Sequence, residues 1–324
     1  MHQVRTDLAL EAHEMYRQSE TKEHAPGVMV EEEELGKITV TRVRIENHQG
    51  QKALGKPIGT YVTLEIPSLI HKEQEIFERA ISALAKEIEH LCSVDEDAPV
   101  LVVGLGNRMI TADALGPKVV ESLLVTRHMF ELMPQEIKDG VRPVSALSPG
   151  VLGLTGIETS EIIKGVVEKV HPSLVIAIDA LASRRLDRIS TTIQIANTGI
   201  TPGAGIGNVR KGLTEETLGV PVIAIGVPTV VDAATMASDT IDLVMDELMS
   251  QSGEGSKIYA LIKNLDREEK YELIQQALSS GLGNMVVTPK EVDEIIEDIA
   301  KIISNSINMA LHKGITPEDV NRYS

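Results

Sequence analysis

The chain has 324 residues, enough to bury one large core or two domains. Its 31 Lys and Arg against 48 Asp and Glu give a formal charge of −17, and it has no Trp and two Phe, so binding to nucleic acid or an anionic membrane is disfavoured. The single cysteine cannot form an internal disulfide, and the sequence has neither a secretory signal nor an apolar stretch of the roughly 20 residues that span a bilayer, so we expect a cytoplasmic protein.

The N-terminal third shows three successive patterns. Residues 1–25 are polar and end at Ala25-Pro26-Gly27, which predicts an exposed tail with one short helix around Leu8 to Arg17. Residues 26–67 alternate with a period of two, as in the run from Ile38 to Ile45, and predict a small antiparallel β unit. Apolar residues at helical spacing then predict a helix that begins near Ile76 and ends near His90.

The middle of the chain alternates between strand and helix patterns. We expect strands near 99–104, 142–147, 173–179, 191–196 and 220–226, and helices near 113–125, 159–170 and 232–249. Such alternation predicts an α/β fold with a mostly parallel, doubly wound sheet. In the C-terminal helical region, 250–324, Thr288, Pro289 and Glu291 form a capping-box pattern before a last helix. We therefore expect one α/β domain over 26–324, with 26–67 as an appendage.

Two acids stand where the predicted strands end. Asp113 follows the apolar run from Val100, and Asp179 closes the run from Leu174. Ligands bind outside the carboxyl ends of parallel strands. If the first three parallel strands lie in the order 2-1-3, strands one and three are about 5 Å apart, and the two carboxylates would share a proton or bind a cation. Each acid alone also fits a structural role, as a charge in a first helical turn or a turn acid that pairs with arginine.

Other motifs favour structural interpretations. The run Gly104-Leu-Gly-Asn lacks the third glycine of a dinucleotide-binding pattern, so it predicts a tight turn. The glycines of 202–208 lack the lysine of a phosphate loop and predict a flap or substrate loop. Asp232 follows a further strand and is expected to be a charge at a helix N-terminus. The nine histidines are scattered, and nothing resembles a zinc protease or serine hydrolase motif.

Longer blocks carry a more specific signal. These are Gly104-Leu-Gly-Asn, Thr111-Ala-Asp-Ala-Leu-Gly-Pro-Lys118, Thr155-Gly-Ile-Glu-Thr-Ser160, Ala177-Ile-Asp-Ala-Leu-Ala182, the run from Pro221 to Ala233, and Met285-Val-Val-Thr-Pro-Lys-Glu-Val-Asp293. In this order they resemble the germination protease of spore-forming bacteria, over nearly the whole chain. The fold also resembles hydrogenase maturation proteases, which bind metal with an additional histidine that the stretch from Gly226 to Asp232 lacks.

The resemblance implies a function and its residues. It implies an endopeptidase without a cofactor that degrades small acid-soluble spore proteins at germination, inside the spore or forespore. Asp113 and Asp179 would be the catalytic acids of an atypical aspartic mechanism. The protein would be a homotetrameric zymogen that cleaves itself between Asp7 and Leu8, so residues 1–7 would be a pro-segment and 8–25 an exposed N-terminal segment.

The substrate-binding residues are less determined by sequence. Acidic side chains in the cleavage segment, such as Asp7 and Glu11, lead us to expect basic partners, for which the candidates are Arg127, Arg184, Arg185, Arg210 and Lys211. Two alternatives stay open at this point. One is a metal-dependent peptidase like the hydrogenase maturation proteases, and the other is a noncatalytic binding protein that uses the loop from Gly203 to Gly207.

Overall fold

The computed structural model describes residues 6–20, 25–67, 69, 73–132, 139–203, 210–251, 274, 276 and 285–314. The strands are β1 (Val28–Leu35), β2 (Ile38–Ile45), β3 (Gly59–Glu65), β4 (Val100–Gly104), β5 (Val144–Leu147), β6 (Leu174–Ser183), β7 (Thr192–Ala196), β8 (Val222–Asp232) and β9 (Val286–Val287). The α-helices are α1 (Ala9–Glu20), α2 (His48–Leu54), α3 (Gln74–Leu91), α4 (Leu115–Glu121), α5 (Arg127–Leu132), α6 (Leu152–Thr155), α7 (Thr159–Val170), α8 (Glu215–Leu218), α9 (Ala233–Gln251) and α12 (Val292–Leu311), with short 3-10 turns η2 (Thr111–Asp113) and η3 (Leu186–Arg188).

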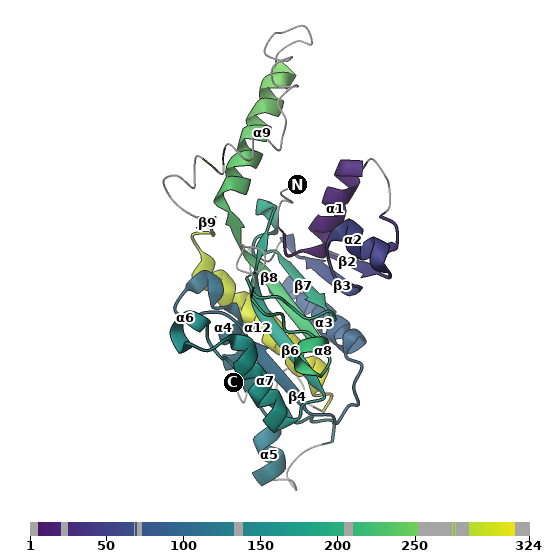
Figure 1. The fold of residues 1–324 in the computed structure, drawn as a ribbon, viewed down its shortest axis with the longest axis vertical. Helices are drawn as coiled ribbons and strands as arrows, with labels where there is room; N and C mark the ends of the chain where they lie inside the picture. Colours follow the sequence, from purple (N-terminus) through teal and green to yellow (C-terminus); the bar gives the residue numbers. More distant parts are fainter. Residues whose placement is uncertain are drawn as a thin grey trace.

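One sheet runs through the molecule in the order β1-β2-β3-β7-β8-β6-β4-β5, with β9 paired to β8 (Figure 1). β5, β4, β6 and β8 are parallel to one another, and β7 is antiparallel to β8. The α/β fold class is thus confirmed, as is the 2-1-3 order, since β4 lies between β5 and β6. The antiparallel strands β1 to β3 are present as predicted, but β3 pairs with β7, so they extend the main sheet instead of forming a separate appendage.

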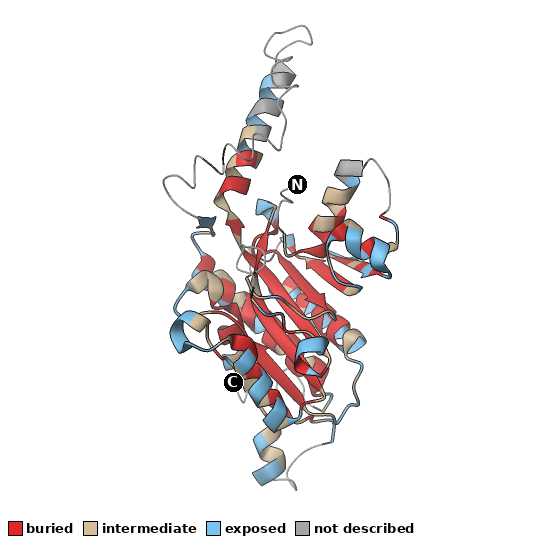
Figure 2. Cartoon of the chain, in the orientation of Figure 1, coloured by how far each residue is buried: buried red, intermediate tan, exposed pale blue. Residues whose placement is uncertain are grey.

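Helices cover both faces of the sheet. On one face, α3, α4 and α12 pack against the strands and form the largest apolar cluster. On the other, α7 and α8 cover the parallel half, while α1 and α2 cover the antiparallel half. Figure 2 shows the strands between these layers as buried and the outward sides of the helices as exposed. The all-apolar run of β4 is buried throughout, as expected for a strand covered on both faces.

The last helix is present as predicted, but its predicted cap is not. Ile296, Ile299 and Ile303 are fully buried against the sheet. However, α12 starts at Val292 after Glu291, without a side-chain cap. Thr288 lies four residues before the first residue of the helix, and its hydroxyl donates to the carbonyl of Thr229 at 2.9 Å. That hydrogen bond ties the segment before α12 to β8.

The N-terminal segment is not the exposed tail that composition predicted. Leu8 and Ala9 are fully buried, and Leu10 and Glu11 nearly so. Helix α1 starts one residue later than expected and runs to Glu20. Ala9 packs in the apolar cluster of the antiparallel strands, with Ala12 and Tyr16 at its border. The few apolar residues in a polar stretch are the ones that dock it, so the prediction of an exposed segment over 8–25 is wrong for its first residues.

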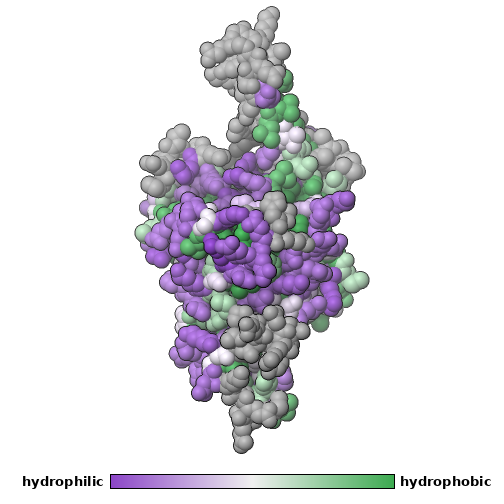
Figure 3. Space-filling view, turned by 180° about the vertical axis from the view of Figure 1, so that it is seen from behind, coloured by the Kyte–Doolittle hydropathy of each residue, from purple (hydrophilic) through white to green (hydrophobic). Residues whose placement is uncertain are grey.

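Helix α9 projects away from the sheet (Figure 1). Leu243, Val244 and Leu248 on it are exposed, Leu243 by 71%. Seen from behind, apolar atoms gather on this projecting part (Figure 3). None of the helices in the described ranges is long and apolar enough to cross a membrane.

Candidate active site

Asp179 lies within β6, one residue beyond the level at which the neighbouring strand β4 ends, because β6 runs on to Ser183 instead of ending at Asp179 as predicted. It pairs with Gly226 on β8, which pairs in turn with Gln194 on β7. Residues opposite one another in neighbouring strands point to the same face, so the side chains of Asp179 and Gln194 share the face covered by α7 and α1. Asp179 is only 5% exposed. Its Oδ1 accepts a hydrogen bond from the Ala180 amide at 3.0 Å.

Asp113 is held by the turn that follows β4. The amide of Asn107 donates to Asp113 Oδ2 at 2.8 Å. Gly106 has φ +108, and a Cβ there would lie 2.1 Å from the Asp113 carbonyl oxygen and 3.0 Å from its Oδ1. The turn therefore requires glycine at this position, both for its backbone angle and for space. The tight-turn interpretation of Gly104 to Asn107 is confirmed, and its effect is to seat the Asp113 carboxylate.

Asp113 is close enough to Asp179 for its charge to act on that acid. Burial raises the pKa of Asp179 well above its usual value, and the negative charges of Asp113 and Asp7 raise it further. Burial also raises the pKa of Asp113, but the Asn107 amide and the positive charge of Arg210 oppose that rise. Desolvation and like charge favour the protonated acid. The surroundings therefore favour the protonated form of Asp179, whereas the ionised form of Asp113 has hydrogen-bond and charge support.

The N-terminal segment lies against the end of β6. The Asp7 amide donates to the Ala182 carbonyl at 3.3 Å, and the Ala182 amide donates to Asp7 Oδ2 at 3.0 Å. On the far side of Asp7, Gln194 Nε2 donates to the Asp7 carbonyl oxygen at 3.2 Å. Gln194 Oε1 accepts from the Ala9 amide at 2.7 Å. The main chain around Asp7 and Leu8 is thus fixed between β6 and β7, beside Asp179.

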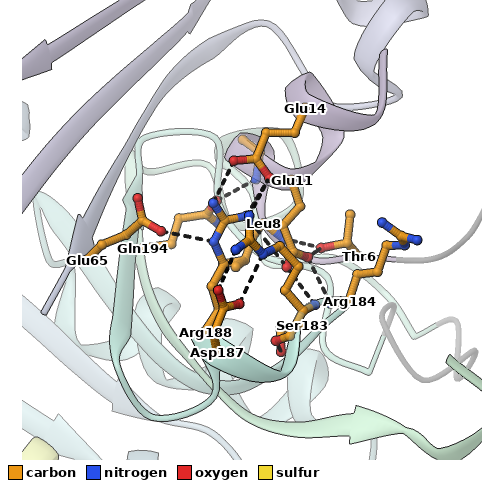
Figure 4. Close-up of polar contacts among 12 residues, drawn as sticks. Thr6, Leu8, Glu11, Glu14, Glu65, Ser183, Arg184, Asp187, Arg188 and Gln194 are labelled. Carbon is orange, nitrogen blue, oxygen red and sulfur yellow. Dashed lines mark hydrogen bonds and ion pairs between the residues drawn. The ribbon is translucent and has the colours of Figure 1, made fainter. Parts of the chain in front are cut away.

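Glu11 anchors this segment from within α1 (Figure 4). Its carboxylate is 1% exposed and accepts from the amides of Arg184 at 2.8 Å and Arg185 at 2.9 Å. The hydroxyl of Thr6 also donates to it. Carboxylates that accept backbone N–H groups form strong, charge-assisted bonds. The start of α1 is therefore bound to the turn that follows β6.

Arg188 adds an ionic contact beside Glu11. Its guanidinium is 4% exposed and reaches Glu14 at 2.7 Å and Glu65 at 3.1 Å. A longer contact of 3.6 Å joins it to Glu11. Figure 4 shows these side chains converging from α1, β3 and η3. One buried cation thus joins three parts of the chain that are distant in sequence.

The predicted basic residues differ in whether they lie near the site. Arg210 is near the acid pair, since its charge acts on Asp113. Arg184 and Arg185 bind Glu11 of the N-terminal segment through their main-chain amides. The Arg184 guanidinium pairs with Asp239 of α9, while that of Arg185 pairs with Asp187 and, at 3.9 Å, with Glu14 of α1. Lys211 is exposed next to Arg210. Arg127 is not brought to the site: it pairs with Glu131 next to the point where Thr126 bonds Val144 at the start of β5, at the amino ends of the strands.

Two residues at the site are absent from the sequence-based candidates. Lys56 Nζ donates to the carbonyl oxygens of Thr6 at 2.9 Å and Asp7 at 3.0 Å. Gln194 binds the main chain of Asp7 and Ala9. A polar amide inside the apolar strand Thr192–Ala196 is a signal that could have drawn attention to Gln194. Lys56 follows α2 in a polar turn, and nothing in its local sequence distinguishes it from a surface lysine.

The last acid at a strand end, Asp232, has a structural role. Its Oδ1 accepts from the Thr235 amide at 3.0 Å, which confirms its predicted place at the N-terminus of α9. Within the described ranges, no group of three or more His, Cys, Asp or Glu side chains is arranged to hold a metal ion. Most of the glycine-rich loop, residues 204–209, lies outside the described residues.

Comparisons with known proteins agree on one family. The germination protease family model matches residues 9–259 and 246–324. A germination protease from Caldanaerobacter subterraneus subsp. tengcongensis is 54% identical over 319 residues, covering 98% of this chain and 97% of its own. One from Clostridium tetani is 53% identical over 320 residues, covering 99% of each chain. One from Bacillus mycoides is 44% identical over 356 residues, covering 99% of this chain and 97% of its own.

Among solved structures, the [NiFe] hydrogenase maturation protease HycI from Thermococcus kodakarensis KOD1 is similar at 18% identity and a TM-score of 0.34, covering 68% of this chain and 98% of its own. So distant a likeness carries no argument about activity. The matches over nearly the whole chain are all proteases, so this α/β chain is a peptidase. It belongs to the germination protease family.

Proposed function

We propose that the chain is an endopeptidase of an aspartic type, with Asp113 and Asp179 as its catalytic acids. One observation carries the proposal: the charges of the half-buried Asp113 and of Asp7 both act on the buried carboxyl group of Asp179, and the main chain at Asp7 is hydrogen-bonded to β6. A water molecule positioned between two such acids can attack a peptide carbonyl carbon, with one acid as general base and the other as general acid.

The surroundings of the two acids support a division of roles. Asp113 acts as the base, because the Asn107 amide and Arg210 favour its ionised form. Asp179 acts as the acid, because burial and the charge of Asp113 favour its protonated form. Transfer of a proton from Asp113 back to Asp179 after each turnover restores the starting state. No cofactor is needed for this chemistry.

The substrates we propose are small acid-soluble spore proteins, which the enzyme would begin to degrade at germination in the cytoplasm of the spore or forespore. Support comes from family membership and from the sequence blocks that contain both acids. Residues 26–324 would form the single protease domain. Arg210 and Lys211 stay candidates for contacts with acidic substrate residues.

Self-processing is the second part of the proposal. The chain would be a zymogen that cleaves itself between Asp7 and Leu8, which makes residues 1–7 the pro-segment. The contacts of Asp7 with Ala182 and Gln194 support this, since they hold the bond next to Asp179 as a substrate would be held. The negative charge of Asp7 also acts directly on Asp179. A homotetramer would be the assembled form, with the exposed apolar side of α9 as a contact surface.

The catalytic proposal is tested with a peptide that spans a spore-protein cleavage site. Asp113→Asn and Asp179→Asn should each reduce kcat by at least about a hundredfold, because each removes a proton-transfer group. Asp97→Asn, an exposed aspartate before β4, is the matched control and should keep full activity. Near-normal turnover in either site variant would refute the acid pair. Loss of activity on chelation, with recovery on addition of a divalent cation, would favour the metal-dependent alternative.

A further inference from the structure

The Asp7 carbonyl oxygen accepts two side-chain hydrogen bonds, from Lys56 Nζ at 3.0 Å and from Gln194 Nε2 at 3.2 Å. This carbonyl belongs to the bond that the proposed self-cleavage would break, so a role for these donors in catalysis rests on that proposed function. Two donors that converge on one carbonyl oxygen, one of them cationic, are what a developing oxyanion requires. Neither donor is among the acids that would exchange protons with water and the leaving group.

We propose that Lys56 and Gln194 form the oxyanion hole of this peptidase. In the step we infer, water attacks the Asp7 carbonyl carbon and gives a proton to the Asp113 carboxylate. The carbonyl π electrons move onto the oxygen, which becomes the oxyanion held by the Lys56 ammonium and the Gln194 amide. Asp179 then protonates the Leu8 nitrogen, the C–N bond breaks and the carbonyl re-forms as a carboxyl group.

The sheet register places Gln194 correctly for this role. Asp179, Gly226 and Gln194 are successive partners across β6, β8 and β7. The side chains of Asp179 and Gln194 therefore project from the same face, two strand spacings or about 10 Å apart at the backbone. A carbonyl group held by the end of the Gln194 side chain lies over that face, and the side chain of the same residue, Asp7, bonds the Ala182 amide on β6 and acts by its charge on Asp179.

Gln194 is fixed in orientation by a second bond. Its Oε1 accepts from the Ala9 amide at 2.7 Å, so Nε2 faces the Asp7 oxygen. One amide group thus binds the main chain on both sides of the Asp7–Leu8 bond. Gln194 is also 8% exposed and lies within a strand, which keeps it rigid. Rigid donors lose little reorganisation energy when charge develops on the oxygen.

Lys56 is held in place by its neighbours. It lies between Gly55, which ends α2 in a left-handed conformation, and Pro57, whose carbonyl accepts from the Tyr61 hydroxyl at 2.9 Å. Burial lowers the pKa of Lys56, while the charges of Asp7 and Glu11 raise it. An ammonium with little water around it interacts strongly with a nearby negative oxygen. The second hydrogen bond of Lys56, to the Thr6 carbonyl oxygen at 2.9 Å, is also made to the main chain.

These contacts would serve any substrate that binds as residues 6–9 do, because they involve no substrate side chain except that of Asp7. A purely structural clamp would make the same ground-state contacts. The two roles differ in what a variant loses. A clamp variant loses docking of the segment, whereas an oxyanion-hole variant loses rate from a docked segment.

The experiment measures both quantities in the full-length chain. Self-cleavage is followed by intact mass, and docking is followed in an Asp113→Asn background by hydrogen exchange of the amides of residues 7–12 other than Ala9, whose amide bonds Gln194 itself. Lys56→Met and Gln194→Leu should each lower the self-cleavage rate by about 10² to 10³, while exchange protection changes less than about threefold. Lys56→Arg should recover part of the rate. Lys52→Met, an exposed lysine of α2, is the control and should change neither.

Three outcomes would overturn the inference: a normal rate in Lys56→Met, a rate loss that matches the loss of protection, or cleavage at another bond. Failure of the wider proposal looks different. If Asp113→Asn and Asp179→Asn cleave normally, the acid pair itself is wrong. If they are inactive and Lys56→Met is normal, only the oxyanion hole is wrong.

Discussion

At the scale of single residues, two aspartates of one site are made unequal by their surroundings. Asp179 is enclosed by the apolar strands of the central sheet and has one amide donor. Asp113 lies in a turn outside β4, with the Asn107 amide on one oxygen and the charge of Arg210 nearby. In the proposed mechanism the same type of side chain holds a proton in one place and accepts one in the other.

The raised pKa of Asp179 predicts how stability depends on pH. In the unfolded chain an aspartate releases its proton near pH ~3.9, whereas the folded chain retains it to a higher pH. Wild type therefore loses stability as pH rises from about 4 to the raised pKa, at roughly 1.4 kcal/mol per pH unit. Asp179→Asn cannot ionise and escapes this loss.

Urea unfolding of the wild type and of Asp179→Asn between about pH 4 and pH 8 is the measurement. The free energy of unfolding of the variant should rise relative to that of wild type as pH rises. The difference between the two should become constant above the pKa of Asp179 in the folded chain. Asp97→Asn, which lies in an exposed loop, should show no such trend. A difference between Asp179→Asn and wild type that is constant across this range would show that Asp179 is not a buried protonated acid.

At the scale of elements, α1 depends on a few long-range contacts. Arg188 reaches Glu14, Glu65 and Glu11 from a 4% exposed position. Removal of one partner from a buried ion pair leaves the charge of the other partner buried and uncompensated, which lowers the free energy of unfolding by about 3 to 5 kcal/mol. Arg188→Met should therefore release the start of α1 and slow self-cleavage.

Two measurements test the role of Arg188: hydrogen exchange of the amides of residues 8–17, and the rate of self-cleavage followed by intact mass. Both should change in Arg188→Met, with faster exchange and slower cleavage. Arg79→Met removes an exposed pair with Glu75 on α3, which contributes little, and should match wild type. Protection of α1 that persists in Arg188→Met would contradict the role of this ion cluster.

The same elements explain how far the sequence predicts the structure. β4 and the first five residues of β6 are predictable because an all-apolar run has only one stable place, inside the sheet, and the pairing of these runs brings Asp113 near enough for its charge to act on Asp179. The docking of Leu8 and Glu11 is not predictable, since their partners are about 175 positions away, as in the bond from the Arg184 amide to Glu11. The role of Lys56 is not predictable for the same reason, since its carbonyl partners at Thr6 and Asp7 are about 50 positions away.

At the scale of the whole molecule, one sheet has two halves. The parallel half carries the two acids, and the antiparallel half carries Gln194 and packs against the N-terminal segment. The site forms where the two halves meet. Helix α9 leaves this body and presents exposed apolar side chains (Figure 3). Exposed apolar surface of this kind commonly marks an interface.

The proposed tetramer makes this surface testable. Wild type should sediment as a tetramer of the 35.1 kDa chain, and Leu243→Gln with Leu248→Gln should sediment as a smaller species because the contact loses apolar area. Leu154→Gln removes a comparably exposed leucine of α6 and should leave the assembly intact. A monomeric wild type, or an unchanged tetramer in the α9 double variant, would contradict this assignment.

Cleavage of the chain's own Asp7–Leu8 bond by Asp113 and Asp179 joins the proposed site to the proposed activity. Intact mass of the purified full-length chain, followed over time beside Asp179→Asn, measures that cleavage without any added substrate. We expect wild type to lose the segment from Met1 to Asp7 while Asp179→Asn keeps it. A wild-type chain that never loses this segment, or an Asp179→Asn chain that loses it at the same rate, would show that these acids do not process the chain.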